Sequence, residues 1–321
     1  MPSLILILAA VGLVAGAVAA ALSQLVRPRV LGLLQRMPVE QQANLLLVWA
    51  LLPLLAGLMA VAVVVAPSVS AALGLTADHC LLHGTHHSHL CLLHPGTTPE
   101  VPGAWALLGL LAAGLTLGGV YKVRVLERAN RPWRTLRRVA REERQGPTRI
   151  LETAQPVAAT VGLLRPNVLF SRGLLDLLSP QQDRAVRAHE AAHRLRRDPL
   201  RLVLARLGTV LHLPGTGRAL YRELGLAVER AADEAAARTV GDRVTVAEAL
   251  LAVARMRPVP APGPGFTGDP LEARVQALLE DVPAGLQPWR GTGSALVGLA
   301  LAALSFSPQF HHGLETLLGH L

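Results

Sequence analysis

Long uncharged apolar stretches constrain this chain more than any other feature. There are four of them, at residues 4–22, 45–66, 104–120 and 294–306. A helix needs about 20 apolar residues to cross the hydrocarbon core of a bilayer, so the first three stretches are long enough to span it. The fourth is shorter, and it is either a fourth span or a buried core helix. We therefore expect a mainly α-helical integral membrane protein with about four transmembrane helices.

The composition supports a membrane protein and disfavours other classes. Apolar residues make up 51% of the chain, charged residues only 17%, and the mean hydropathy is +0.39. Soluble domains carry about 25% charged residues. The net charge of +9 would suit a nucleic acid, but aromatic residues amount to only 3%, so few side chains could stack on bases. We expect no direct nucleic-acid binding, and two cysteines are too few for a disulfide scaffold.

The positions of Lys and Arg predict the topology in the membrane. Three arginines lie between the first two apolar stretches, and the other 28 basic residues lie between Lys122 and Arg290. Because cytoplasmic segments collect Lys and Arg, residues 23–44 and 121–289 are expected to be cytoplasmic. Residues 67–103 and the C-terminal tail contain neither and are expected to be external. The predicted location is the plasma membrane, crossed several times.

The first apolar stretch has a second interpretation, a cleaved signal peptide, because residues 19–21 are small alanines. No Lys or Arg precedes Arg27, so the basic region of a signal peptide is missing. A retained helix with an external N-terminus is favoured. The chain then divides into a membrane region with three helices, a cytoplasmic domain, and a fourth helix with a short external tail, at residues 1–120, 121–290 and 291–321.

The cytoplasmic region is expected to be mostly helical with a small β element. Residues 156–170 alternate in polarity and predict a short hairpin. Residues 158–160 within it are either an edge strand that pairs with an extended substrate or an ordinary core strand. Ser179-Pro180 predicts a capped helix start, and Asp198-Pro199 predicts the end of that helix. Further helix starts are predicted at Thr245 and Asp269, with a loop rich in proline and glycine at residues 257–268.

One constellation in the helix that starts at Ser179 indicates specific chemistry. His189, Glu190 and His193 form a His-Glu-x-x-His pattern. Residues four apart share a helix face, so both imidazoles can reach one metal ion and Glu190 can reach a water beside it. Zinc peptidases use this arrangement, with three protein ligands and one open position on the metal. Glu190 is the candidate catalytic residue, because it can take the proton of the water and pass it to the leaving amine.

A third zinc ligand has to come from elsewhere in the chain. Glu229 and Asp233 lie on a helical pattern and share a face. Glu229 can complete the site, and Asp233 can hold a ligating histidine through its other ring nitrogen. The alternative is an exposed charged helix face that carries His-Glu-x-x-His by chance. The capped helix and the distant Glu-x-x-x-Asp pair favour one catalytic zinc ion.

The surrounding residues resemble a known family. Residues 166–233 look like the peptidase region of the sensor-transducer membrane metallopeptidases, the BlaR/MecR type within the gluzincin clan. The order of three spans, a cytoplasmic peptidase and a fourth span is also similar. The motifs that carry the resemblance are Ser171-Arg172-Gly173-Leu174-Leu175, Leu178-Ser179-Pro180, the segment from His189 to His193, Arg196-Arg197-Asp198-Pro199 and the segment from Glu229 to Asp233.

The resemblance implies a gluzincin-type domain with zinc at His189, His193 and Glu229 and with Glu190 catalytic. It also implies signalling by cleavage of the chain itself or of a cytoplasmic transcriptional repressor. Whether the chain forms a homodimer is left open. The antibiotic sensors carry a penicillin-binding domain after the fourth span. Here about 15 residues follow Phe306, without a Ser-x-x-Lys serine, so β-lactam sensing is not expected. Membrane quality-control and prenyl-protein proteases are a second resemblance, disfavoured by the Arg-Arg-Asp-Pro segment.

The external segments are rich in residues that bind metals. They hold nine of the twelve histidines and both cysteines. The same Cys-Leu-Leu-His sequence occurs twice, with Cys80 and His83 in one copy and Cys91 and His94 in the other. These four side chains could hold a second metal, zinc or Cu(I). A disulfide between the two cysteines is the alternative in an oxidising compartment.

The sequence therefore predicts an integral-membrane zinc endopeptidase that turns an external signal into cytoplasmic proteolysis. Its expected partners are the lipid bilayer and a peptide or protein substrate. A housekeeping membrane protease is one alternative. A receptor whose His-rich loop senses metal, with a silent peptidase domain, is another. Self-cleavage within residues 257–268 is a further hypothesis. The alternative is that this segment is an inert connector between two helices.

Overall fold

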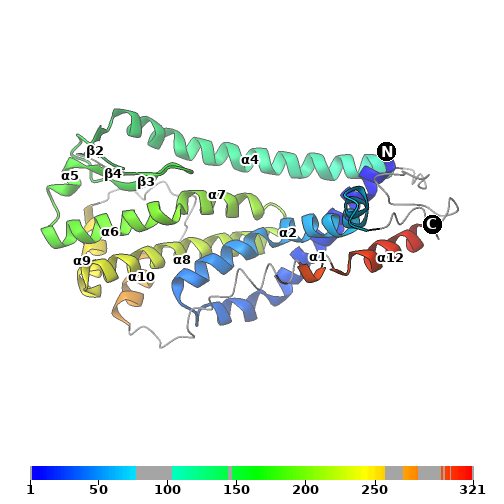
Figure 1. Ribbon diagram of the computed structural model, residues 1–321. Coiled ribbons are helices and arrows are strands. Elements are labelled where there is room, and N and C mark those ends of the chain that lie inside the picture. The colour runs from blue at the N-terminus through cyan, green and yellow to red at the C-terminus, as the bar shows by residue number, and fades with distance from the viewer. Residues whose placement is uncertain are drawn as a thin grey trace.

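Helices dominate the computed structural model, and a small sheet lies at the end of the molecule opposite the N-terminus (Figure 1). The structure describes residues 2–76, 103–143, 147–256, 270–280, 298, 301–303 and 305–319. Most of the predicted His-rich loop and all of the loop at residues 257–268 lie outside these residues. So does most of the predicted fourth span. The predicted start of the His-rich loop at Pro67 was wrong, because the helix that begins at Val39 continues to Ala72.

Among the described residues, three helices are long and apolar enough to cross a membrane, and they coincide with three of the four predicted spans. They are α1 (Pro2–Leu34), α2 (Val39–Ala72) and α4 (Ala104–Val139). The first two cross very closely at glycines, because a Cβ built on Gly57 would lie 2.7 Å from the carbonyl oxygen of Gly12. Close contacts between small residues are a common way for membrane helices to associate.

The sheet has four strands in the order β1-β2-β4-β3. The strands β3 (Ala158–Val161) and β4 (Asn167–Ser171) are antiparallel, as expected for the predicted hairpin. Gly162 follows β3 with φ +111°, a conformation that favours glycine, as the hairpin turns. The strand β2 (Thr148–Leu151) is parallel to β4, and β1 (Arg141–Glu142) is antiparallel to β2. Among the described strands, β3 is therefore an edge strand.

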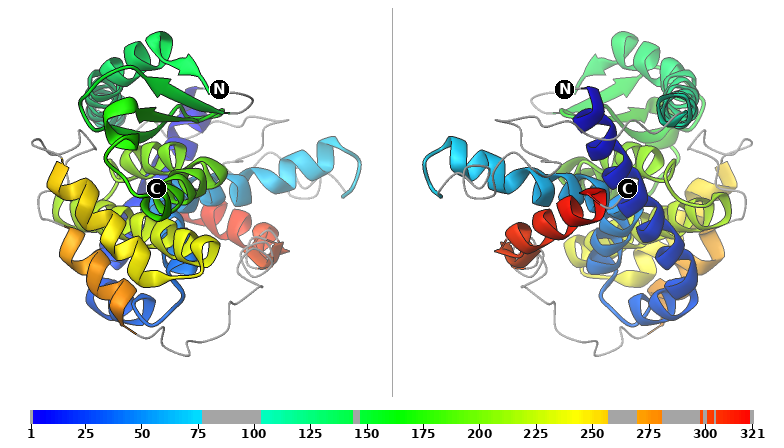
Figure 2. Two further views of the ribbon diagram at one scale, coloured as in Figure 1. Left: turned by 90° about the vertical axis from the view of Figure 1, so that its left-hand side faces the viewer. Right: turned by 90° about the vertical axis from the view of Figure 1, so that its right-hand side faces the viewer.

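In the described part of the chain, six helices lie between the sheet and the C-terminal segment. They are α5 (Arg172–Leu175), α6 (Pro180–Arg196), α7 (Asp198–Gly208), α8 (Pro214–Val240), α9 (Arg243–Met256) and α10 (Pro270–Leu279). Three of them, α7, α8 and α9, contact α6. The sheet lies on one side of α6, and α8 and α9 lie on the other (Figure 2). This arrangement places α6 in the middle of the domain, where its side chains are covered from both sides.

The boundaries of α6 follow from its caps, as predicted. The Ser179 hydroxyl accepts a hydrogen bond from the Gln182 amide, and the Gln182 side chain accepts one from the Ser179 amide. At the other end Arg197 has φ +54°, the left-handed conformation that ends the helix, and α7 begins at the next residue. The predicted start of α9 at Thr245 was wrong by two residues, because the helix begins at Arg243. Asp242 caps this helix, since its carboxylate accepts hydrogen bonds from the amides of residues 244 and 245.

The peptidase-like region packs directly on the membrane helices. Leu46, Trp49 and Ala50 of α2 form one apolar cluster with Leu220 and Leu224 of α8. The end of α7 also contacts α2, because a Cβ built on Gly208 would lie 2.5 Å from the carbonyl oxygen of Ala50. The domain is thus continuous with the helices that carry it, and α8 is fixed relative to α2.

A C-terminal helix, α12 (Ser307–Gly319), occupies the segment that was predicted as a short tail. It packs against α2, and the Nδ1 of the buried His311 lies 2.8 Å from the carbonyl oxygen of Val64. The pattern of the tail did not indicate this contact, because it depends on a partner that is distant in sequence.

Candidate metal centre and cleft

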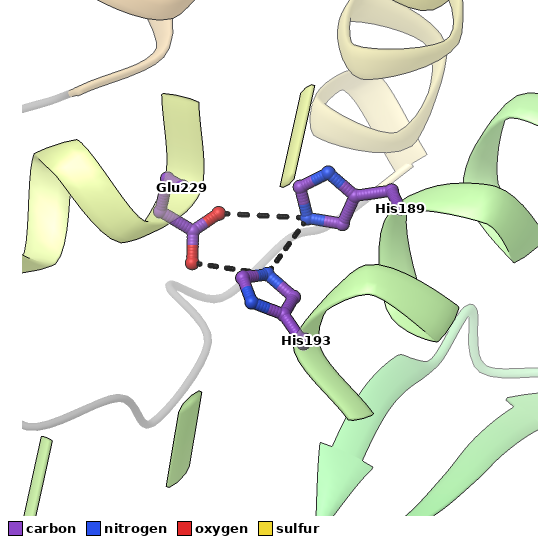
Figure 3. A group of neighbouring side chains, drawn as sticks. All are labelled: His189, His193 and Glu229. Carbon is purple, nitrogen blue, oxygen red and sulfur yellow. Dashed lines mark hydrogen bonds and ion pairs between the residues drawn. The ribbon is translucent and has the colours of Figure 1, made fainter. Parts of the chain in front are cut away.

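Two helices bring the three predicted zinc ligands together. His189 and His193 lie one turn apart on α6, and Glu229 faces them from α8 (Figure 3). The two Nε2 atoms are 3.0 Å apart. One oxygen of Glu229 lies 3.6 Å from Nε2 of His189, and the other lies 3.6 Å from Nε2 of His193. All three groups offer ligand atoms within 4.8 Å of one another.

A carboxylate faces the outer nitrogen of each imidazole. Nδ1 of His193 lies 2.7 Å from an oxygen of Asp198, and Nδ1 of His189 lies 2.9 Å from an oxygen of Asp233. A carboxylate beside Nδ1 favours the tautomer with the proton on that atom, which leaves the lone pair on Nε2. Two lone pairs that face each other at 3.0 Å need a cation between them.

The donor set fits zinc. Two imidazole nitrogens and one carboxylate oxygen are ligands that zinc takes in catalytic sites, where a fourth position stays open. The carboxylates beside both Nδ1 atoms are the usual partners of imidazoles that bind metal. In the part of the chain that the structure describes, His189, His193 and Glu229 therefore form a zinc site.

The charges around the site keep its acidic groups ionised. Burial raises the pKa of Glu229, but Arg274 and His193 outweigh this effect and hold the pKa well below its usual range. Burial likewise raises the pKa of Asp233, and contacts with Arg274 and His189 lower it overall. Burial lowers the pKa of His189, but Asp233 and Glu229 raise it to about 9. In the metal-free protein a proton on His189 therefore stands in for the positive charge of a metal.

Glu190 lies beside the ligands and is tied to the sheet. Its carboxylate accepts a hydrogen bond of 2.7 Å from the hydroxyl of Thr160, which also lies 3.0 Å from the main-chain oxygen of Glu190. Thr160 belongs to the edge strand β3, and the side chain of Glu190 is almost fully buried. The sequence did not single out Thr160 for this contact, because nothing local distinguishes it from any other strand threonine.

Asp198 has a larger part in the site than the sequence indicated. We predicted it as a helix stop that can cap the next helix and as part of a family motif, but without a contact to the zinc ligands. It is 1% exposed and contacts three side chains. Besides His193, its carboxylate accepts hydrogen bonds from Arg196 at 3.0 Å and from Arg201 at 3.2 Å. These arginines neutralise a buried carboxylate that would otherwise be costly to maintain. The Arg-Arg-Asp-Pro segment was the sequence feature that could have indicated this role of Asp198.

Arg274 is a site residue that the sequence analysis missed. It lies on α10 and contacts both carboxylates of α8, with distances of 2.9 Å to Glu229 and 2.7 Å to Asp233. Its side chain is only 13% exposed. No local motif surrounds Arg274, and 41 residues separate it from Asp233, so only the folded structure shows the contact.

The metal centre lies in a cleft of about 520 Å³. Its walls come from α4, β3, α7, α9 and α10, which contributes Arg274, in addition to the two helices that carry the ligands. Several wall residues are apolar, among them Leu126 of α4, Leu202 of α7 and Leu250 of α9. The cleft can therefore take a chain segment with apolar side chains and hold it beside Glu190. The other predicted metal ligands, Cys80, His83, Cys91 and His94, lie outside the described residues.

Comparison with known proteins points to the same part of the chain. Residues 133–227 match the model of a family described as Peptidase family M48. The match covers the end of α4, the sheet, α6, α7 and about half of α8, and it stops two residues before Glu229. No curated protein and no solved structure matches the chain.

Proposed function

We propose that this chain, which carries a zinc metallopeptidase domain of family M48, is a membrane endopeptidase that couples an external signal to proteolysis on the cytoplasmic side. The observation that supports peptidase chemistry best is the convergence of His189, His193 and Glu229 beside Glu190 in one cleft. A zinc ion held there would supply a Lewis acid that polarises the scissile carbonyl and lowers the pKa of a water molecule.

In the proposed mechanism Glu190 moves the proton. Its carboxylate takes a proton from the attacking water as the water oxygen bonds to the carbonyl carbon. It then gives this proton to the leaving nitrogen as the C–N bond breaks. Thr160 fixes the carboxylate in one orientation by its hydrogen bond. Asp198 and Asp233 fix the orientation of the two imidazoles from behind, at Nδ1.

The edge strand β3 is the proposed guide for the substrate. It lines the cleft, and its outer edge has no partner strand among the described residues. An extended peptide can add to such an edge by main-chain hydrogen bonds. Because main-chain hydrogen bonds do not depend on side chains, such pairing would present a peptide bond beside Glu190 for many substrate sequences. The apolar walls would then select among side chains.

Two features support a link between the membrane and the site. The helix α4 runs without a break from its candidate span to the wall of the cleft, which it reaches at Leu126, Trp133 and Arg137. The helix α2 packs against α8, the helix that carries Glu229. A movement of either span would reach the cleft through packed side chains. We therefore favour the sensor-transducer type, with the substrate either the chain itself or a cytoplasmic repressor.

A matched pair of glutamate variants tests the proposed activity. Glu190→Gln should abolish cleavage of the chain or of an added peptide and should retain bound zinc. Glu248→Gln, at an exposed position on α9, is the control and should cleave like the wild type. Cleavage that persists in Glu190→Gln would contradict the peptidase mechanism. Cleavage that is equal with and without an external stimulus would favour the housekeeping alternative.

A further inference from the structure

Arg274 links the metal centre to a helix that none of the zinc-peptidase motifs includes. The inference rests on the proposed function, because it concerns the same zinc site. We propose that Arg274 is a positioning residue, which orients the third zinc ligand Glu229 and fixes Asp233 behind His189. Through this side chain α10 becomes part of the metal centre.

The geometry of the guanidinium carries this proposal. Its Nη1 lies 2.9 Å from Oε2 of Glu229. Its Nε and Nη2 donate to Oδ2 and Oδ1 of Asp233 at 2.8 Å and 2.7 Å. One planar group thus contacts both carboxylates, and its planar fork fixes their orientation as well as their charge. Oε1 of Glu229, which faces His193, remains available for a metal ion.

Asp233 passes this constraint on to a ligand. The oxygen that accepts from Nη2 of Arg274 is the same oxygen that lies 2.9 Å from Nδ1 of His189. Arg274 therefore acts on two of the three zinc ligands, on Glu229 directly and on His189 through Asp233. Partners of this kind, one contact removed from the metal, usually change metal affinity or activity by about 10- to 100-fold when they are mutated.

Burial explains why the site needs such a partner. The side chain of Asp233 is 2% exposed, and Glu229 lies one helical turn away on the same face of α8. Two carboxylates this close repel each other in a poorly hydrated site unless a cation lies between them. Arg274 supplies that cation permanently, because a guanidinium stays protonated throughout the physiological pH range.

The attachment of α10 to the domain can be separated from this contact. Arg230 of α8 donates to the carbonyl oxygen of Ala273 at 3.1 Å. Arg243 of α9 donates to the carbonyl oxygens of Ala277 and Leu278 at 2.7 Å and 2.9 Å. Both arginines hold α10 by its backbone, and among the described residues neither side chain forms a hydrogen bond or ion pair with a zinc ligand. They are therefore matched controls for an effect that arises only from the docking of α10.

The test compares metal binding in full-length variants. Zinc affinity is measured by competition with a chelator, and the coordination is read from the visible absorption of the Co²⁺-loaded protein. Arg274→Gln should weaken zinc binding by about 10- to 100-fold and should change the Co²⁺ spectrum. Arg274→Lys, which keeps the charge but not the planar fork, should not restore either property. Arg230→Gln and Arg243→Gln should stay within about twofold of wild type.

Kinetics add a second readout. A residue that acts through the ligands should lower kcat and leave KM within about twofold. A large rise in KM in Arg274→Lys would instead indicate direct contact with substrate and would overturn a purely positioning role. If Arg274→Gln fails to fold, Arg274→Lys retains the buried charge, and its zinc affinity and Co²⁺ spectrum are compared with those of the wild type instead.

Three results would overturn the proposal. They are unchanged zinc affinity and spectrum in Arg274→Gln, full rescue by Arg274→Lys, and equal losses in the Arg230→Gln and Arg243→Gln controls. A wild-type protein that binds no zinc would contradict the proposed function itself. Normal zinc binding in both the wild type and the Arg274 variants would contradict only the role of Arg274.

Discussion

Thr160 and Glu190 are joined by a hydrogen bond of 2.7 Å between a strand hydroxyl and a buried carboxylate. The strand is the edge of the sheet that lines the cleft, so one side chain connects the proposed substrate guide to the proposed proton acceptor. A hydrogen bond to a charged group contributes about 1.5–3 kcal/mol. The orientation of Glu190 should therefore depend strongly on this single hydroxyl.

Removal of the hydroxyl tests this dependence. Thr160→Val keeps the volume and shape of the side chain, and we expect kcat to fall about 10- to 100-fold, from the strength of a charged hydrogen bond. KM and zinc content should stay near wild type, and Thr160→Ser should restore most of the rate. Thr239→Val, whose hydroxyl bonds only within its own exposed helix turn, is the control. Equal kcat in Thr160→Val and wild type would exclude the contact from catalysis.

The zinc ligands themselves give the second prediction. His193→Ala and Glu229→Ala each remove one of three ligand atoms, so both purified proteins should lose most of their zinc. Metal content by mass spectrometry checks this result. His312→Ala, in the C-terminal helix, should retain the metal. Full zinc retention in both ligand variants would show that the metal is bound elsewhere.

The third prediction concerns the pH dependence of zinc binding. The pKa of His189 in the metal-free protein is raised to about 9, so zinc must displace a proton from this side chain below that pH. Apparent zinc affinity should therefore rise as the pH rises toward about 9, and binding near neutral pH should release about one proton. Titration calorimetry in buffers of different ionisation enthalpy measures the proton.

In the metal-free protein the stability of the fold should fall as the pH rises, whereas zinc affinity should rise. A raised pKa means that the contact of protonated His189 with Asp233 stabilises the fold fully below the unfolded value of 6.5. This contribution is lost as the pH rises through about 9. Zinc affinity that is independent of pH between about 6.5 and 8.5 would contradict the assigned proton.

The fourth prediction concerns the orientation in the membrane. The basic residues predict that the peptidase domain is inside and that residues 67–103 are outside. In a chain without its native cysteines, Ser88→Cys should react with an impermeant thiol reagent added to intact cells. Arg184→Cys, at an exposed position on α6, should react only after the cells are opened. The reverse pattern would invert the proposed topology.

Local sequence patterns accounted for the parts of the site that lie on single helices. The capping box at Ser179 located the start of α6, and the spacing of His189 and His193 placed both imidazoles on one face. The Glu-x-x-x-Asp pattern on α8 located Glu229 and Asp233 for the same reason. Helix periodicity fixes these relations within a few residues, so no tertiary information was needed.

The contacts between elements could not be predicted from the sequence patterns. Thr160 reaches Glu190 from a strand, and Arg274 reaches Glu229 from α10, only because the sheet and α10 pack on opposite sides of the α6–α8 pair. The packing of α12 on α2 is of the same kind. Each contact depends on the relative position of elements that are remote in sequence, and no periodicity within either element encodes it.

The continuity of α4 predicts that the cleft responds to the thickness of the bilayer. Its 36 residues form a rod about 54 Å long at 1.5 Å per residue. When a bilayer thins, a span that is too long for it accommodates by tilting. A tilt of about 5° about the membrane end would move the far end of this rod by about 5 Å, from the same helix length. Trp133 and Arg137 line the cleft near that end, so we expect lipid composition alone to change the width of the cleft beside Glu190.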